Sequence, residues 1–215
     1  AESLRKVVKQ QPGNAGAWTG LGSVCLKLER VDEALSAYLR VAVLQPESAM
    51  PHLILGTLFQ KKGMHEDAKE QYRHTLRLDP GIATARYFLS ALGEGEPPAQ
   101  SPARYVETLF DDYAGKFDQH LVQELDYHIP ELVNQAVRGV ITAGDAKLNV
   151  LDLGCGTGLG GALLRDMAQR LSGVDLSPRM VEQARLRAVY DELMVGDILL
   201  PLSTPAAAFD LIIAC

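Results

Sequence analysis

The chain has 215 residues, with 27 acidic and 21 basic side chains and a formal net charge of −6. This balance disfavours a nucleic-acid partner, because the phosphates would be repelled and no basic run with interleaved aromatics appears. The three cysteines are widely spaced and odd in number, which indicates reduced thiols in a cytoplasmic compartment and no metal site. No apolar run approaches the length of a membrane span, so we expect no membrane partner.

Residues 1–92 contain an internal repeat. Proline recurs at a spacing of 34 residues, and the same shift superposes a Leu-Gly pair, an alanine and a tyrosine of one unit on those of the next. These landmarks are Pro12, Pro46 and Pro80, Leu21-Gly22 and Leu55-Gly56, Ala34 and Ala68, and Tyr38 and Tyr72. The pattern resembles the tetratricopeptide (TPR) repeat, a helix–turn–helix unit of this length. The small residues allow close helix approach, and each proline stops a second helix.

The resemblance implies an all-α TPR helical repeat array over residues 1–92. Two full repeats are expected at 14–46 and 48–80, with residues 1–11 as the second helix of an earlier repeat. Residues 82–92 are expected to form the first helix of another repeat or a solvating cap. Because the array begins in mid-repeat and the first residue is not Met, we expect the chain to be a fragment at its N-terminus.

The inner surface of this array is a candidate groove for a protein or peptide partner. TPR arrays curve, and the first helix of each repeat lines the concave face. The residues expected there are Thr19, Ser23, Leu26, Leu53, Thr57 and Gln60. This face is mildly polar with apolar points, which suits an extended peptide, and it lacks the Lys and Asn pattern of a chaperone-tail clamp. The alternative is that the short array only caps and solubilises the rest of the chain.

A change of composition marks the end of the array. Residues 93–103 are rich in Gly, Glu and Pro, which is typical of a linker. The stretch 104–112 is predicted to be a helix, and further helix is expected to about Val140 with an interruption near Pro130. The part after the linker, residues 104–215, is therefore expected to be a second domain.

Residues 149–158 read Asn-Val-Leu-Asp-Leu-Gly-Cys-Gly-Thr-Gly, an apolar strand that ends in an acid and runs into a glycine loop. Glycines tolerate positive φ, and such a loop brings bare amides and a helix N-terminus to an anionic group. Gly156, Gly158 and Gly161 also match the G-x-G-x-x-G pattern of dinucleotide sites. Asp152 argues against NAD, because a carboxylate repels a pyrophosphate but attracts an ammonium or a sulfonium.

This segment resembles the first motif of the class I S-adenosylmethionine-dependent methyltransferases. The resemblance implies an α/β Rossmann-like domain that binds S-adenosyl-L-methionine and releases S-adenosyl-L-homocysteine. It also implies that the motif contacts the cofactor. The residues expected to do so are Asp152, Gly154, Cys155, Gly156, Thr157 and Gly158.

A second acid follows at the end of the next predicted strand. Asp175 lies in the apolar run 171–176, and Ser177-Pro178 then has the pattern of an N-cap followed by proline in the first helical turn. An acid about 20 residues beyond the glycines is placed to accept the hydroxyls of a ribose. The alternative is that Asp175 only assists the start of the helix.

A third acid, Asp197, follows the predicted strand 193–195. The resemblance implies that it binds the adenine amino group and that Ile198 covers one side of the ring. Leu176 and Met180 are expected on the other side. Ligands of open α/β sheets bind outside the carboxyl ends of the strands, where these acids would meet.

In many methyltransferases of this class an aromatic-rich helical segment before the first strand folds over the cofactor. The stretch 104–113 resembles that lid, and Tyr113 is its expected cofactor contact. The alternative is that Tyr113 and Phe117 are aromatic residues of the core.

The last predicted strand is 209–215, so four strands are expected where the family usually has seven. We therefore expect a methyltransferase domain that is incomplete at its C-terminus, and no catalytic base can be named. The methyl acceptor is left open between a protein and a small molecule. The alternative function is a TPR scaffold whose methyltransferase-like domain binds cofactor but is inactive.

Overall fold

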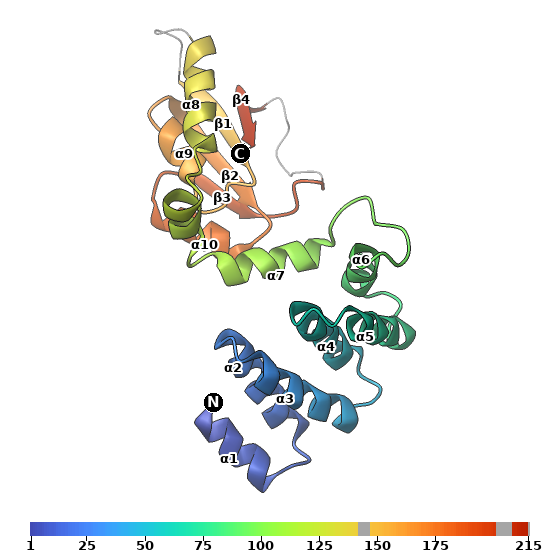
Figure 1. The fold of residues 1–215 in the computed structure, drawn as a ribbon. Helices are drawn as coiled ribbons and strands as arrows, with labels where there is room; N and C mark the ends of the chain where they lie inside the picture. Colours follow the sequence, from blue (N-terminus) through green and yellow to red (C-terminus); the bar gives the residue numbers. More distant parts are fainter. Residues whose placement is uncertain (142–146, 201–207, 215) are drawn as a thin grey trace. The chain divides into compact units, whose positions relative to one another are not determined.

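The computed structural model describes residues 1–141, 147–200 and 208–214. The chain divides into two compact units, residues 1–102 and residues 103–215 (Figure 1). In the described ranges, no helix has both the length and the apolar character needed to cross a membrane.

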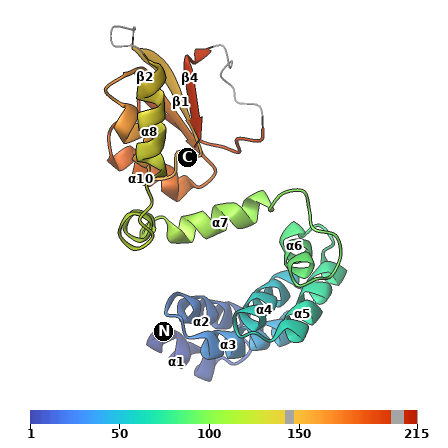
Figure 2. The same cartoon turned by 45° about the horizontal axis from the view of Figure 1, so that its top comes forward.

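The first unit is entirely helical. Its elements are α1 (Glu2–Gln10), α2 (Ala15–Lys27), α3 (Val31–Leu44), α4 (Ala49–Lys61), α5 (His65–Leu78) and α6 (Ala83–Ala91). Helices α2 and α3 pack as one hairpin and α4 and α5 as the next, as Figure 2 shows from a second direction. These hairpins match the predicted repeats, and the predicted all-α array is confirmed.

The 34-residue period reflects one packing contact made twice. A Cβ added to Gly22 would lie 2.6 Å from the ring of Tyr38, and one added to Gly56 would come closer still to Tyr72. Each glycine therefore leaves the space that the tyrosine of the following helix fills. Ala34 and Ala68, which lie in the first turn of those second helices, are fully buried, as the close approach of the helices requires.

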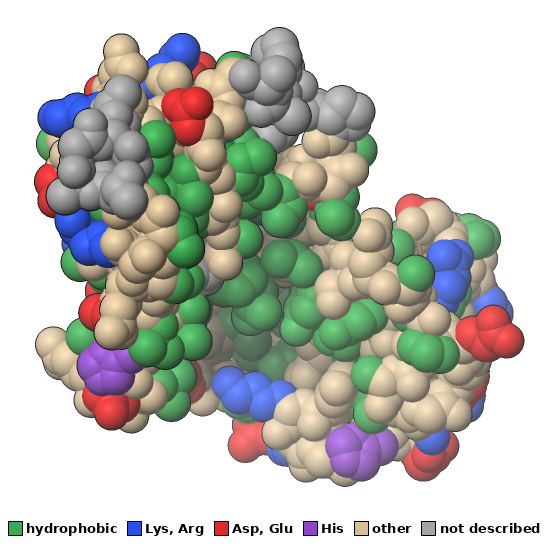
Figure 3. Space-filling model, turned by 90° about the horizontal axis from the view of Figure 1, so that it is seen from above, with side chains coloured by type: hydrophobic (Ala, Val, Ile, Leu, Met, Phe, Trp, Pro, Cys, Tyr) green, Lys and Arg blue, Asp and Glu red, His purple; other side chains and the backbone are tan. Residues whose placement is uncertain are grey.

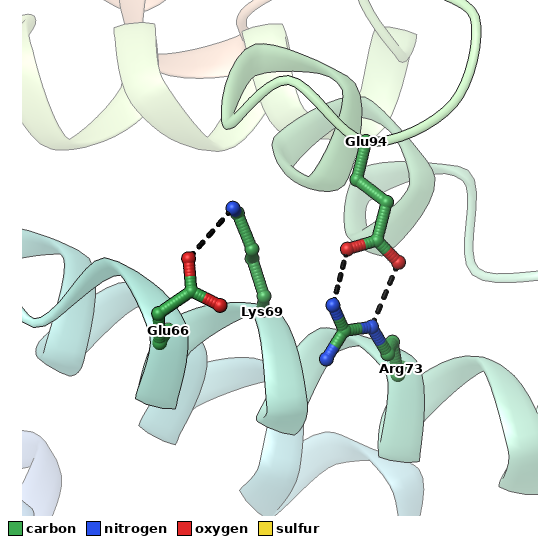
Figure 4. A network of polar contacts seen from close by, with 4 residues as sticks. All are labelled: Glu66, Lys69, Arg73 and Glu94. Carbon is green, nitrogen blue, oxygen red and sulfur yellow. Dashed lines mark hydrogen bonds and ion pairs between the residues drawn. The ribbon is translucent and has the colours of Figure 1, made fainter.

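The array continues a little beyond its last helix. Gly93, with φ of +83°, ends α6, and the amide of Glu94 donates to the carbonyl of Leu89 at 2.9 Å, as in a Schellman cap. The Glu94 carboxylate accepts two hydrogen bonds from the Arg73 guanidinium on α5, the Nε bond being 2.7 Å long (Figure 4). This contact lowers the pKa of Glu94. The start of the predicted linker is thus attached to the helical unit.

The second unit is an α/β domain with a parallel sheet. Its elements are α7 (Ala103–Tyr113), the π-helix η1 (Gln119–Glu124), α8 (Ile129–Val140), β1 (Leu148–Leu153), α9 (Leu159–Leu164), β2 (Ala168–Asp175), α10 (Pro178–Leu186), β3 (Glu192–Val195) and β4 (Leu211–Ala214). The strands lie in the order β3-β2-β1-β4, and every neighbouring pair is parallel. This confirms the predicted Rossmann-like fold class. Of the predicted last strand, Cys215 lies outside the described residues.

The sheet brings the carboxyl ends of β1, β2 and β3 to one edge. Leu153 is paired with Val174, and Asp175 is paired with Val195. The core beneath this edge is apolar and includes Val137 of α8 together with Val150, Leu164, Leu171 and Ile213. Parallel strands covered by helices place loops at this edge, and the candidate site lies there.

Candidate functional site

The glycine loop joins β1 to α9 at the carboxyl edge of the sheet. Gly154, Gly156 and Gly158 have φ values of +69°, +53° and +89°, so the prediction of left-handed backbone at these positions is confirmed. Residues other than glycine rarely adopt such φ values. The amides of Gly154 and Cys155 both donate to the carbonyl of Val174, at 2.8 and 3.0 Å. These bonds fasten the loop to the end of β2.

Asp175 binds both the glycine loop and the start of α10. Its Oδ2 accepts the Gly156 amide at 2.9 Å, and its Oδ1 accepts the Ser177 amide at 2.8 Å. Ser177 then caps α10 through its hydroxyl, which accepts the Met180 amide at 3.1 Å. Each carboxylate oxygen retains a second lone pair, so the predicted binding of ribose hydroxyls stays a prediction.

Asp152 is the next-to-last residue of β1, and its side chain is only 1% exposed. Its Oδ2 accepts a hydrogen bond from the Tyr190 hydroxyl at 2.7 Å, whereas Oδ1 has no partner among the described residues. Burial raises the pKa of Asp152 to about 6, and the Tyr190 hydrogen bond opposes that rise. An unpartnered buried oxygen fits a nearby cationic ligand, but contact with one stays a prediction.

Tyr190, which precedes β3, is a site residue that the sequence did not reveal. A Cβ added to Gly161 would overlap the Tyr190 hydroxyl, and one added to Gly173 would lie 2.9 Å from its ring. The third glycine of the G-x-G-x-x-G match therefore makes room for an aromatic ring. A glycine inside a strand, as at position 173, signals a close approach of this kind.

Cys155 and Thr157 are engaged within the protein. Cys155 is a buried free cysteine, and burial raises the pKa of its thiol, which favours the protonated form over the thiolate nucleophile. Thr157 donates its hydroxyl to Asp118 and accepts a hydrogen bond from Arg187 at its carbonyl, at 2.7 Å. Their predicted cofactor contacts remain untested.

The loop is covered by aromatic residues of the segment before the sheet. A hollow above it is lined by Phe117, Tyr127, Pro130 and the stretches 154–157 and 159–160. The Phe117 ring lies 3.9 Å from where a Cβ of Gly156 would stand.

Tyr113, the predicted lid residue, does not line this hollow. Its ring packs edge-on against Phe117, with centroids 5.4 Å apart, and against His120 at 5.5 Å. Tyr113 therefore supports the residue that covers the loop, and Phe117 and Tyr127 are the aromatics that the sequence analysis did not select.

The predicted adenine contacts lie in the turn after β3 and around the start of α10. The Gly196 amide donates to the carbonyl of Asp175 at 2.9 Å, which holds this turn beside the end of β2. Asp197 accepts the Leu199 amide through Oδ1 at 2.9 Å. Ile198 is 46% exposed and Leu176 is half-buried, whereas Met180 is buried. The acids and Ile198 are thus at one edge, and Met180 is part of the packing below it.

Comparisons with known proteins agree with this architecture. A family model described as a methyltransferase domain matches residues 150–215, and two TPR models match residues 1–49 and 52–82. The bovine 18S rRNA (guanine-N(7))-methyltransferase is 34% identical over 68 residues, which are 32% of this chain and 24% of the relative. Human methyltransferase-like protein 27 is 34% identical over 106 residues, 48% of this chain and 43% of the relative.

Among solved structures, a putative methyltransferase from Haloferax volcanii, in complex with the Trm112 methyltransferase activator, is 29% identical with a TM-score of 0.40. The match covers 51% of this chain and 46% of that one. The chain spans less than half the length of the two curated relatives. It carries tetratricopeptide repeats at its N-terminus, followed by a methyltransferase domain.

Proposed function

We propose that this chain binds S-adenosylmethionine at the carboxyl edge of its sheet and transfers the methyl group to an acceptor delivered with the help of the TPR array. The observation that carries the proposal is the glycine loop, which has three left-handed glycines, is fastened to Asp175 and is covered by Phe117. Loop amides, an acid and an aromatic cover suit a ligand with polar ends and a flat base.

In this proposal, each residue at the sheet edge contacts a different part of the ligand. Asp175 accepts the ribose hydroxyls, and Asp197 accepts the adenine amino group. The apolar side chains of Ile198, Leu176 and Met180 border the adenine. The unpartnered Oδ1 of Asp152 faces the cationic part of the ligand, which would also favour the ionised form of this carboxyl.

The sulfonium of the bound cofactor supplies an already activated methyl group. What the chain contributes is alignment, because in-line transfer depends mainly on the placement of the two reactants. Phe117 and Tyr127 line the space above the loop, where they would limit the access of water to a bound ligand. In the described residues we identify no group that would accept a proton from the acceptor.

The array contributes a protein-binding surface in this proposal, and an extended segment of the partner lies across its first helices. Most polar groups there already have partners: Thr19 donates to the Ala15 carbonyl at 2.9 Å, and Ser23 bonds the Tyr38 hydroxyl at 2.9 Å. The groove would therefore recognise shape and apolar points more than hydrogen bonds. On the face drawn in Figure 3, basic and acidic side chains of the described residues are interspersed, which favours a protein over a nucleic acid.

Calorimetric titration of the full chain with S-adenosylhomocysteine tests the cofactor assignment. We expect binding of S-adenosylhomocysteine and none of NAD. Asp175→Ala should weaken binding about 10- to 150-fold, as expected for hydrogen bonds to a charged group worth about 1.5–3 kcal/mol. A melting temperature raised by NAD but not by S-adenosylhomocysteine would refute the assignment. A change below about threefold for Asp175→Ala would limit its role to the helix start.

Transfer itself is tested with methyl-labelled cofactor and cell extract, comparing the wild type with Thr19→Glu. Thr19 is exposed on the inner helix α2, and its hydroxyl donates only to the Ala15 carbonyl of the same helix. Ser36→Glu is the matched control, because Ser36 is exposed on α3 and makes the same type of bond to Asp32. Loss of labelled protein with Thr19→Glu alone supports delivery by the groove. Cofactor binding without transfer to any protein or small molecule supports the scaffold alternative.

A further inference from the structure

We propose that Asp118 and Arg187 are positioning residues that hold the aromatic cover over the glycine loop and so set how long the cofactor stays bound. This inference rests on the proposed function. Asp118 immediately follows Phe117, which lines the hollow, and immediately precedes η1. Arg187 lies at the end of α10. Neither residue touches the hollow, so both would act through the segments they join.

Asp118, Thr157 and Arg187 form a closed cycle of hydrogen bonds at this point. Asp118 accepts the Thr157 hydroxyl with Oδ1 and the Arg187 guanidinium with Oδ2. The Arg187 Nε donates to the Thr157 carbonyl at 2.7 Å. The cycle therefore joins the covering segment, the glycine loop and α10. Along the chain, Thr157 is 39 positions from Asp118, and Arg187 is 69 positions from it.

The cycle has a well-defined anchor on the loop. Thr157 is buried, and the Arg187 side chain lies 3.2 Å from where a Cβ of Gly158 would stand. Arg187 therefore packs over one left-handed glycine while it binds the residue before it. A shift of Asp118 would release the hydroxyl of Thr157 and the guanidinium of Arg187 at the same time.

The covering segment has a second attachment to α10, at the other end of that helix. Asp111 of α7 accepts the Ser177 hydroxyl at 2.5 Å and the Arg179 amide at 3.1 Å. Phe117 lies between the two attachments in sequence. Loss of the Asp118 contacts would leave the Asp111 end in place, so the segment would swing away from the loop without detaching from the domain.

The exposure of the pair favours a local role over a contribution to global stability. The side chains of Arg187 and Asp118 are 30% and 44% exposed. Ion pairs exposed to this degree usually contribute little to the free energy of unfolding, because water screens them. Their removal should therefore change the motion of the cover more than the melting temperature.

The test uses the full chain and the probe S-adenosylhomocysteine. We expect Asp118→Asn and Arg187→Gln each to raise its dissociation rate about tenfold, the lower end for hydrogen bonds to charged groups. Because the cycle is broken by either change, the double variant should dissociate no faster than the single ones. Hydrogen exchange of ligand-free protein should rise over residues 113–127. Arg187→Lys, which keeps the charge, should have a dissociation rate between those of the wild type and Arg187→Gln.

Asp166→Asn is the matched control, because Asp166 pairs with Arg138 at 2.7 Å in the same unit and lines no part of the hollow. It should leave the dissociation rate and the exchange of residues 113–127 unchanged. The inference is overturned if Asp118→Asn changes both quantities less than twofold, or if Asp166→Asn changes them equally. A wild-type chain that binds no S-adenosylhomocysteine would instead overturn the proposed function, and this inference with it.

Discussion

In both units of the chain a tyrosine ring fills the space left by a glycine, but the hydroxyl groups of the two tyrosines donate hydrogen bonds to different kinds of partner. In the helical array the Tyr72 ring packs on Gly56, and its hydroxyl donates to the neutral Gln60 at 2.8 Å. In the α/β domain the Tyr190 ring packs on Gly161, and its hydroxyl donates to the buried carboxylate of Asp152. The first arrangement only joins helices, whereas the second places a titratable group at the end of β1, beside the glycine loop.

The largest expected difference is therefore in pH dependence. Burial raises the pKa of Asp152 from 3.8 to about 6. The stability contributed by its protonated form is fully present below about pH 4 and is lost as the pH rises through 6. Asp152→Asn stays neutral, so its free energy of unfolding relative to the wild type should rise by about 2 kcal/mol between pH 4 and pH 7.

Urea denaturation followed by circular dichroism across this pH range measures the effect. Asp166→Asn is the control, because the Arg138 hydrogen bond lowers the pKa of Asp166 and this carboxyl therefore titrates below most of this pH range, so its profile should run nearly parallel to that of the wild type. Parallel pH profiles of the wild type and Asp152→Asn would show that Asp152 ionises normally.

Replacing each glycine by alanine should show a difference between the two glycine–tyrosine contacts. Gly56→Ala and Gly161→Ala should each destabilise the chain by about 1–3 kcal/mol, because the added methyl group would overpack the core around it. At Gly56 the overlap is with a ring carbon of Tyr72, whereas at Gly161 the nearest atom is the Tyr190 hydroxyl oxygen. Tyr190→Phe should therefore relieve part of the cost of Gly161→Ala, and Tyr72→Phe should relieve none of the cost of Gly56→Ala.

The free energy of unfolding of each single and double variant gives this comparison. Gly13→Ala is the control, because nothing lies within 4 Å of a Cβ added there. Equal relief by the two tyrosine substitutions would contradict the difference drawn between the two contacts.

The hydroxyl groups alone should have smaller effects. Tyr190→Phe leaves the buried Asp152 without its hydrogen bond and should cost about 1–3 kcal/mol. Tyr72→Phe should cost about 0.5–1.5 kcal/mol, because the half-buried Gln60 can turn to water. Because the Tyr190 bond lowers the pKa of Asp152, the cost of Tyr190→Phe should be greater at pH 7 than at pH 5. Chemical denaturation at both pH values checks this, and a pH-independent cost would count against it.

The smallest expected effect is at the boundary between the units. Limited proteolysis should cut within residues 95–102 and leave a helical fragment, with no change in the stability of either unit. The Arg73–Glu94 contact should protect residue 94, and Arg73→Gln should move the earliest cut toward α6. Equal protection of residues 95–102 and the helices would mean that this stretch is docked on a folded surface.

The repeats and the glycine loop could be predicted because their signals are local. The contact between Gly56 and Tyr72 recurs 34 residues earlier between Gly22 and Tyr38, so the sequence carries the pattern twice. The loop's left-handed positions need glycine whatever surrounds them, and these residues were found.

The supporting residues could not be predicted because their partners are distant in sequence. Tyr190 reaches Asp152 across 38 positions, and Asp118 reaches Arg187 across 69. No local spacing encodes such contacts. That Phe117 and not Tyr113 lines the hollow could not be predicted for a similar reason, since it depends on how α7 attaches to α10 through Asp111, and the cofactor contact of Tyr113 stays a prediction.

The attachment of Glu94 to α5 shortens the tether between the two units to residues 95–102. A flexible tether of this length has a root-mean-square span of about 15 Å, and its prolines would stiffen it toward an extended span of about 25 Å. Sites joined over such distances experience effective concentrations in the millimolar range. Under the proposed function, a segment held only weakly by the array would therefore still be presented to the methyltransferase domain far above its concentration in solution.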